Sequence, residues 1–223
     1  MTSGSAKTLL PSGVGDELPP RAAHEARVIE RLLACFDAYG YDRVKPPLIE
    51  FEDSLFDGPG RALAEQTFRL MDPVSQRMMG VRPDMTVQIA RIAATRLAQA
   101  PRPLRLSYAG QVLRVRGTQL RPERQFAQAG FELIGGLGSA GDAEVIALAA
   151  EVLADIGVAD LSIDLTMPTF VPALCAELGL DDADCARARE SLDRKDAAAL
   201  GGLGKRAAGL LSEVLAAAGP VDE

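Results

Sequence analysis

Three polar side chains on two strand-like segments have the types and spacing needed to bind a charged small molecule. Gln128 and Glu132 lie four residues apart with Gly130 between them, so in an extended strand all three face one side. Gly130 leaves room between the amide and the carboxylate, which suits a ligand that carries an ammonium group. Arg114, on the preceding segment, adds a planar guanidinium suited to carboxylate or phosphate. The sequence therefore predicts neighbouring sites for a cation and an anion.

Asp84 and Thr86 offer two further oxygens where a helix is expected to begin. Their alternative role is to cap that helix. Gln128 and Glu132 have an equally plain alternative on an exposed sheet face, and Arg114 has one in a surface ion pair. A buried Glu132 would need a charged partner, because an unpaired buried carboxylate costs several kcal/mol. The ammonium group of a ligand could be that partner.

The elements that must position these residues alternate between helices and strands. Apolar spacing and turn residues predict, in order, a helix over 20–39, an extended segment over 44–51, a hairpin of 67–71 with 77–81, a helix after Pro83 through Arg96, a hairpin of 104–115 with 125–134, a helix over 142–156 and a strand over 161–165. From Thr169 onward the chain is rich in Ala and Leu with glycine breaks, which indicates three or four short helices. The fold class is α+β with a helical appendage.

Length and composition limit the classes of protein to which this chain could belong. With 223 residues, 48% of them hydrophobic, the chain can bury one sizeable core. No apolar run reaches the roughly 20 residues of a membrane span, and the N-terminus has no secretory pattern, so we expect a cytoplasmic protein. Cys35, Cys175 and Cys185 lack C-x-x-C spacing, and His24 has no neighbouring ligand. We therefore expect structural cysteines, no metal site and no cofactor.

The charge is unevenly distributed. A net charge of −7 argues against general affinity for nucleic acid, which depends on many Lys and Arg contacts. The segment 82–124 nevertheless contains nine arginines against Asp84 and Glu123, a local balance of +7. This segment could hold an anion, although solvated arginine faces are the alternative for most of these side chains.

Four short stretches together resemble the N-terminal part of the class II synthetase core found in histidyl-tRNA synthetases, over residues 9–164. They are KPPLIE at 45–50, VRPDMT at 81–86, YAGQVLR at 108–114 and QFAQAGFELIG at 125–135. The resemblance implies an antiparallel sheet flanked by helices in residues 1–167, containing the motif 1 and motif 2 regions. It also implies that residues 168–223 are a helical insertion or appendage inside which the chain stops.

The resemblance further implies a histidine-binding site of a regulatory kind, and no catalytic residues. The matching positions are Asp84, Met85, Thr86, Arg114, Gln128 and Glu132. In the synthetases, an arginine at the position of Arg114 is followed two residues later by a glutamate that helps to place adenine. Here that second position is Arg116, a reversal of charge that argues against adenylate formation.

The pattern is more similar to the regulatory subunit that short-form ATP phosphoribosyltransferases need for activity and for feedback inhibition by histidine. We therefore expect a non-catalytic protein that forms a hetero-oligomer with the catalytic subunit, self-associates as a dimer, and responds to L-histidine as an effector. The alternatives are a histidyl-tRNA synthetase fragment that activates histidine with ATP, and a scaffold that has lost histidine recognition. No nucleic-acid or membrane partner is expected.

Overall fold

The computed structural model describes residues 10–136, 138–217 and 219. Contacts divide the chain into two compact units, Met1–Leu161 and Ser162–Glu223. The boundary expected from the sequence, between residues 167 and 168, lies a few residues later. Each unit has its own buried core.

The larger sheet of the first unit carries the predicted site residues. Its strand order is β1-β5-β6, with β1 at Asp42–Arg43, β5 at Leu104–Leu113 and β6 at Gln125–Ile134. β1 runs parallel to β5, whereas β5 and β6 pair antiparallel along their whole length. In this register Tyr108 lies opposite Gly130, and Leu106 lies opposite Glu132. The long hairpin predicted from the sequence is confirmed.

A second, smaller sheet adjoins it. Its strand order is β2-β4-β3, with β2 at Ile49–Phe51, β3 at Phe68–Met71 and β4 at Met78–Val81. All its pairings are antiparallel. The two sheets are joined by an isolated bridge between Thr67 and Arg114 and by the bond from Val115 N to Gln66 O at 2.9 Å. Arg114 is thus fixed at the junction of the two sheets.

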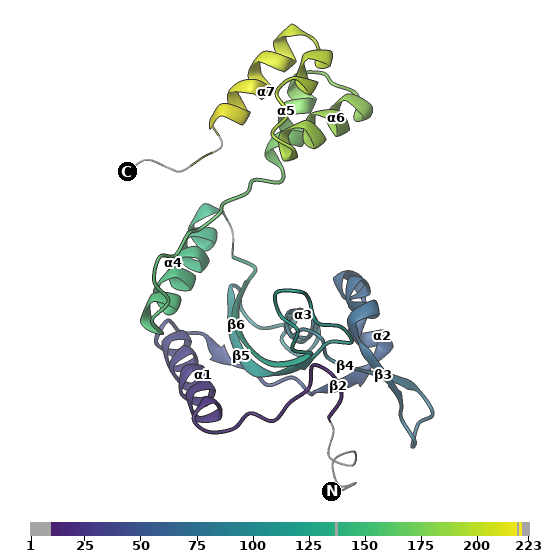
Figure 1. Ribbon diagram of the computed structural model, residues 1–223, viewed down its shortest axis with the longest axis vertical. Coiled ribbons are helices and arrows are strands. Elements are labelled where there is room, and N and C mark those ends of the chain that lie inside the picture. Colours follow the sequence, from purple (N-terminus) through teal and green to yellow (C-terminus); the bar gives the residue numbers. More distant parts are fainter. Residues whose placement is uncertain (1–9, 137, 218, 220–223) are drawn as a thin grey trace, which may run out of the picture. The chain divides into compact units, whose positions relative to one another are not determined.

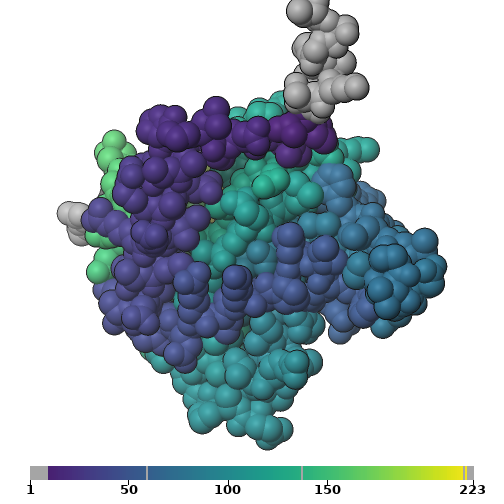
Figure 2. Space-filling view, turned by 90° about the horizontal axis from the view of Figure 1, so that it is seen from below, coloured from purple at the N-terminus to yellow at the C-terminus, as the bar shows by residue number. Residues whose placement is uncertain are grey.

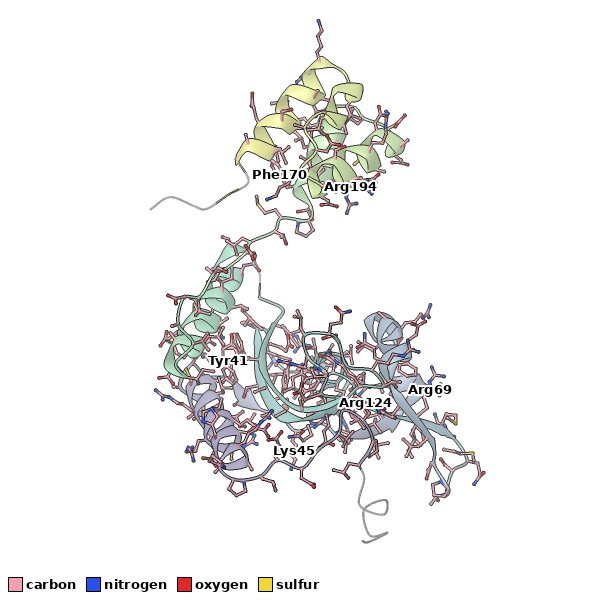
Figure 3. All side chains as sticks on the ribbon, viewed as in Figure 1. Tyr41, Lys45, Arg69, Arg124, Phe170 and Arg194 are labelled. Carbon is pink, nitrogen blue, oxygen red and sulfur yellow. The ribbon has the colours of Figure 1, made fainter. Side chains whose placement is uncertain are left out.

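Helices cover both faces of the β5–β6 hairpin (Figure 1). One face packs against α1 (Arg21–Ala38) and α4 (Ser139–Asp155), and the other packs against α3 (Thr86–Thr95). The short α2 (Glu52–Leu55) and η2 (Gly58–Gln66) lie between the strands of the smaller sheet in sequence. Figure 3 shows side chains filling the space between the hairpin and α3, with Tyr41 near α1 and α4. The hairpin is therefore the middle layer of the unit.

Strand alternation decides which face each side chain joins. Leu106, Tyr108 and Val112 pack in a core with Met85 and Ile89 on the α3 side. On the opposite face, the Phe131 ring lies 5.0 Å from the Phe36 ring and 5.1 Å from the Tyr41 ring, measured between centroids. The even-numbered residues of β6, including Gln128 and Glu132, therefore face α3.

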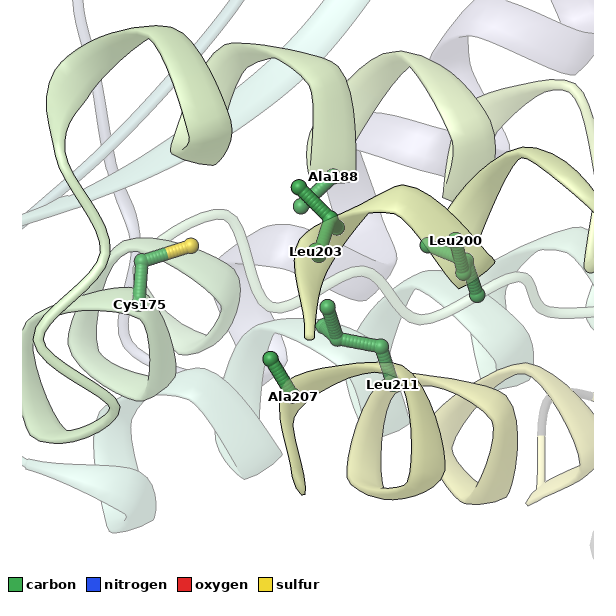
Figure 4. Close-up of a cluster of buried hydrophobic side chains, with 6 residues drawn as sticks. All are labelled: Cys175, Ala188, Leu200, Leu203, Ala207 and Leu211. Carbon is green, nitrogen blue, oxygen red and sulfur yellow. The ribbon is translucent and has the colours of Figure 1, made fainter. Parts of the chain in front are cut away.

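The second unit is a helical cluster. It contains α5 (Phe170–Glu177), α6 (Asp182–Asp193), η3 (Ala199–Leu203) and α7 (Lys205–Ala217). Its core is drawn in Figure 4 and consists of Cys175, Ala188, Leu200, Leu203, Ala207 and Leu211. The prediction of three or four short helices after residue 169 is confirmed.

The strand predicted over 161–165 is wrong. No helix or strand lies between Asp155 and Phe170, and Ile163 and Leu165 are 52% and 67% exposed. The alternation of apolar and polar residues in this segment is typical of a strand, but a strand also needs a neighbour to accept and donate backbone hydrogen bonds. Within the described residues this segment has no such neighbour.

Candidate functional site

The site begins where the loop before α3 meets β6. The Gln128 side chain links two residues of that loop: its Nε2 donates to Asp84 Oδ2 at 2.8 Å, and its Oε1 accepts from Met85 N at 3.0 Å. Asp84 Oδ1 accepts from Thr86 N at 2.8 Å, so Asp84 also serves the first turn of the helix. Met85 is the N-cap residue of α3 and the cap has no side-chain hydrogen bond, so the Asp84 bond is an Asx turn just before the helix and not the predicted N-cap. Because both Gln128 polar atoms are bonded, its amide orientation is fixed.

A second set of polar contacts leads from the start of α3 to Glu132. Tyr108 is only 3% exposed, and its hydroxyl donates to Glu132 Oε1 at 3.1 Å. The same hydroxyl lies 3.2 Å from Thr86 Oγ1. Thr86, Tyr108 and Glu132 thus form one hydrogen-bonded group that spans β5, β6 and α3.

Glu132 is electrostatically unusual. Partial burial raises the pKa of its carboxyl group, hydrogen bonds from Tyr108 and Thr86 act in the opposite direction, and the nearby charge of Asp84 raises it further. Among the described residues no Lys, Arg or His lies within ion-pair distance of Glu132. A cation placed beside this carboxylate would lower its pKa and offset the burial.

The carboxylate borders a space that could admit such a cation. A cavity of about 280 Å³ is lined by Thr86, Ala90, Ala93, Ala94, Arg102, Glu132 and Ile134. Its wall combines the small side chains of α3 with the carboxylate of Glu132 on β6 and with Arg102, whose Nη2 donates to Ala93 O at 3.0 Å. A cavity of this size is near the lower end of the range for small-molecule sites.

Arg114 lies on the same face of the hairpin but borders a different cavity. Its Nε donates to Pro83 O at 3.2 Å, and its guanidinium carbon lies 5.2 Å from the centroid of Phe126. The cavity beside it, about 220 Å³, is lined by Arg114, Arg116, Gly117, Thr118, Arg121, Glu123 and Phe126. The structure thus brings Arg114 next to the Asp84 loop, without bringing it into the cavity of Glu132.

The arginine-rich segment separates into structural and cavity-lining side chains. Arg82 is buried and donates to the carbonyl oxygens of Gln111, Pro46 and Pro47 at 2.9 to 3.5 Å. Arg91 pairs with Glu50, and Arg105 pairs with Glu144. Three others, Arg114, Arg116 and Arg121, line the smaller cavity. A fourth arginine of the segment, Arg102, lines the cavity of Glu132.

Two details of the sequence interpretation need correction. The space above Gly130 is filled by a tyrosine, because a Cβ at residue 130 would lie 2.6 Å from the Tyr108 hydroxyl oxygen. Gly130 therefore admits Tyr108 and does not form an open floor for a ligand. The side chain of Met85 is fully buried against Ile89, so only its backbone N–H contributes to the site.

Tyr108 is the site residue that sequence reasoning missed. It lies in the YAGQVLR stretch among apolar neighbours, a context that predicts an aromatic side chain buried in the core. The signal in the sequence was Gly130, since a glycine in a strand often marks the close approach of a neighbouring group. In the structure that group is Tyr108, which lies opposite Gly130. The hydroxyl gives this buried ring a polar end that reaches Glu132.

Comparison with known proteins decides the family. The model of the family described as "Histidyl-tRNA synthetase" matches residues 13–220. The chain belongs to this family. The α+β fold expected from the four motif stretches is confirmed. A histidyl-tRNA synthetase from Nostoc sp. PCC 7120 superposes with a TM-score of 0.72 at 18% identity, covering 92% of this chain and 48% of that one, a likeness that concerns the fold alone.

Within this family the chain is similar to proteins named "ATP phosphoribosyltransferase regulatory subunit". It is 62% identical over 212 residues to the one from Rhodospirillum centenum, covering 95% of this chain and 55% of that protein. It is 58% identical over 220 residues to the one from Paramagnetospirillum magneticum, covering 99% of this chain and 58% of that protein. The chain therefore spans a little over half the length of these curated relatives.

A solved structure carries both names. The crystal structure of an "ATP phosphoribosyltransferase regulatory subunit/histidyl-tRNA synthetase" from Bacillus halodurans superposes with a TM-score of 0.75 at 26% identity, covering 96% of this chain and 57% of that chain. Two further observations concern the described residues alone. None of their helices is long and apolar enough to cross a membrane. They contain no group of three or more His, Cys, Asp or Glu side chains suited to a metal ion.

Proposed function

We propose that this chain is the synthetase-like part of a regulatory subunit of ATP phosphoribosyltransferase, which senses L-histidine and performs no chemistry of its own. The names of its curated relatives support this choice of subunit. The single observation that carries histidine sensing is the partly buried carboxylate of Glu132, which borders a cavity and has no cationic partner among the described residues. An amino-acid ligand supplies the missing cation.

The proposed ligand site has two parts. Glu132 and Thr86 face the ligand directly, since both line the cavity of about 280 Å³. Asp84, Gln128 and the Met85 backbone hold the loop before α3 in place through the bonds of the Gln128 amide. Arg114 supports this loop through the Pro83 carbonyl. In this assignment the carboxylate of Glu132 provides the charge recognition, and the other residues fix its surroundings.

Regulation then follows from linkage. Histidine inhibits only if it binds two states of the complex with different affinities. By linkage, a ligand of the catalytic subunit that favours one of these states changes the affinity for histidine by the same factor as histidine changes the affinity for that ligand. A coupling of about 1 to 3 kcal/mol corresponds to about 5- to 150-fold in affinity. The proposed partner is the short-form catalytic subunit, and we expect this chain to form a dimer within the hetero-oligomer.

Reconstitution with a short-form catalytic subunit tests the proposal. We expect the chain to raise phosphoribosyl transfer to ATP, and L-histidine to reverse that increase. E132Q should keep the activation and lose the response to histidine, whereas E30Q, which removes a charge from an exposed position of α1, should keep both. If histidine leaves the reconstituted activity unchanged, sensing is wrong. If the chain alone charges tRNA with histidine, the synthetase alternative is correct.

A further inference from the structure

The cavity of Glu132 carries charges of both signs. At one end, Glu132 and Thr86 both contact the Tyr108 hydroxyl, at 3.1 and 3.2 Å, beside the first turn of α3. At the other end, Arg102 Nη2 donates to Ala93 O at 3.0 Å, in the last turn of the same helix. Seven residues of helix separate Thr86 from Ala93, which corresponds to about 10 Å along the axis. The cavity of about 280 Å³ therefore has an acidic end and a basic end.

Two contacts hold the Arg102 side chain in this position. Leu104 pairs with Ile134, so the loop before β5 lies beside the end of β6. There Gly135 leaves space for the stem of Arg102, because a Cβ at residue 135 would lie 3.0 Å from Arg102 Cδ. The end of α3 and the loop that follows it lie on the surface of the first unit, in blue-green at the bottom of Figure 2. Arg102 is itself exposed, so a ligand can reach its guanidinium.

The bond to Ala93 O leaves the guanidinium with donors to spare. An arginine near the end of a helix commonly bonds one of the last carbonyl oxygens, and helix capping alone would explain this bond. Capping uses one of five N–H groups, however, and the planar arrangement of the others matches the two oxygens of a carboxylate. Capping and carboxylate binding are therefore compatible in Arg102.

Arg102 also lies where the sequence pattern had placed Arg114. The pattern predicted neighbouring sites for a cation and an anion, with Arg114 as the anion-binding residue. In the structure Arg114 borders a different cavity, and Arg102 is the arginine that lines the cavity of Glu132. The side chains of Ala90 and Ala94 form the wall between the two charged ends and leave room for a ligand.

We propose that Arg102 binds the carboxylate of the amino acid whose cationic group pairs with Glu132. This inference rests on the proposed function, since it concerns the same ligand and the same cavity. The two charged ends together select a zwitterion. A cation without a carboxylate leaves the Arg102 guanidinium unpaired, and an anion without a cationic group meets the repulsion of Glu132.

Calorimetric titration of the whole chain with L-histidine and with histamine, which lacks the carboxylate, tests the proposal. The preference is the ratio of the Kd for histamine to the Kd for histidine. We expect R102Q to reduce this preference about ten- to a hundredfold through weaker histidine binding, with the affinity for histamine unchanged. R102K keeps the charge without the planar donors and should retain part of the preference. R96Q removes the same charge from the exposed C-cap residue of α3 and should keep all of it.

The outcomes separate this proposal from the proposed function. If R102Q weakens the binding of histidine and histamine by the same factor, Arg102 only caps the helix and the proposal is wrong. If R102Q keeps the full preference while E132Q loses histidine, Glu132 recognises the ligand without Arg102. If the unmodified protein does not bind histidine, both proposals fail. Should a urea titration show that R102Q is unfolded, equal affinities of the unmodified protein for histidine and histamine would overturn the role of Arg102 alone.

Discussion

Glu132, the central residue of the proposed site, is a carboxylate whose partial burial costs stability. Its carboxylate is half-buried, accepts a hydrogen bond from Tyr108, and has no Lys, Arg or His within ion-pair distance among the described residues. A neutral hydrogen bond offsets only part of the cost of burying a charge. A ligand cation would offset the remainder of this cost, and that gain would contribute to the free energy of binding.

E132Q should make the unliganded protein more stable at neutral pH. Because the folded-state pKa of Glu132 is raised, the ionised carboxylate costs stability above that pKa, and the cost disappears as the pH falls through it. The difference in unfolding midpoint between E132Q and the unmodified protein should therefore be positive at pH 7 and shrink in acid. Urea titrations over pH 4–8 measure it. A lower midpoint for E132Q at pH 7 would contradict this account of Glu132.

Gly130 tests the packing of Tyr108. G130A introduces a Cβ 2.6 Å from the Tyr108 hydroxyl oxygen and 2.8 Å from its ring carbon Cζ. We expect a loss of about 1 to 3 kcal/mol in the free energy of unfolding, as overpacked cores show. Y108F removes the nearer atom, so the double variant should lose less than the sum of the two single changes. Strict additivity in a double-mutant cycle would show that the two residues do not touch.

At the scale of elements, a cluster on the other face of the hairpin ties β5 to α4. Arg105 donates to both oxygens of Glu144 at 2.7 Å, and the Tyr41 hydroxyl donates to Glu144 at 2.9 Å. The Arg105 guanidinium, followed by the Tyr41 hydroxyl, holds the pKa of Glu144 below its usual value. This two-point contact has the bidentate geometry that favours Arg–carboxylate pairs.

E144Q should destabilise the protein at neutral pH, with the opposite sign to E132Q. A lowered folded-state pKa stabilises the protein above the unfolded value, and this contribution is lost as the pH falls through the folded pKa. The unfolding midpoint of E144Q should be below that of the unmodified protein at pH 7 and approach it in acid. E30Q, with the same change of charge on an exposed part of α1, serves as the control. A deficit that persists undiminished at the lowest pH would exclude this electrostatic origin.

Local patterns were sufficient for the elements that pair within the chain. The long hairpin could be predicted because its apolar runs flank a polar loop. The prediction of a strand at 161–165 was wrong. Alternation of apolar and polar residues shows that a segment could form a strand, but a strand also requires a neighbouring strand with which to pair. Tyr108 was missed for a related reason, since its role depends on a glycine in the neighbouring strand.

At the scale of the whole molecule, the two units have separate cores, and the segment between Asp155 and Phe170 lacks helix and strand. We expect limited proteolysis to cut first in this segment, because exposed irregular backbone is the preferred site of nicking. A protease that cleaves after large apolar residues would act at Leu161 or Leu165 and leave two resistant pieces, which mass spectrometry identifies. Initial cleavage inside the β5–β6 hairpin or within α5–α7 would contradict the division.

Similarity to the regulatory subunit from Rhodospirillum centenum extends over 95% of this chain. Specific binding of histidine is the central claim, because the regulatory role depends on it. The chain spans 55% of the length of the Rhodospirillum centenum relative, so the relative provides a longer protein for the same measurement.

Calorimetric titration of L-histidine into the unmodified protein, E132Q and E30Q tests this claim most directly. We predict saturable binding to the unmodified protein and to E30Q, and binding to E132Q that is about ten- to a hundredfold weaker, as expected when a charged hydrogen bond worth about 1.5 to 3 kcal/mol is lost. Equal affinity for E132Q and E30Q, or no binding to this chain or to the longer relative, would contradict the account.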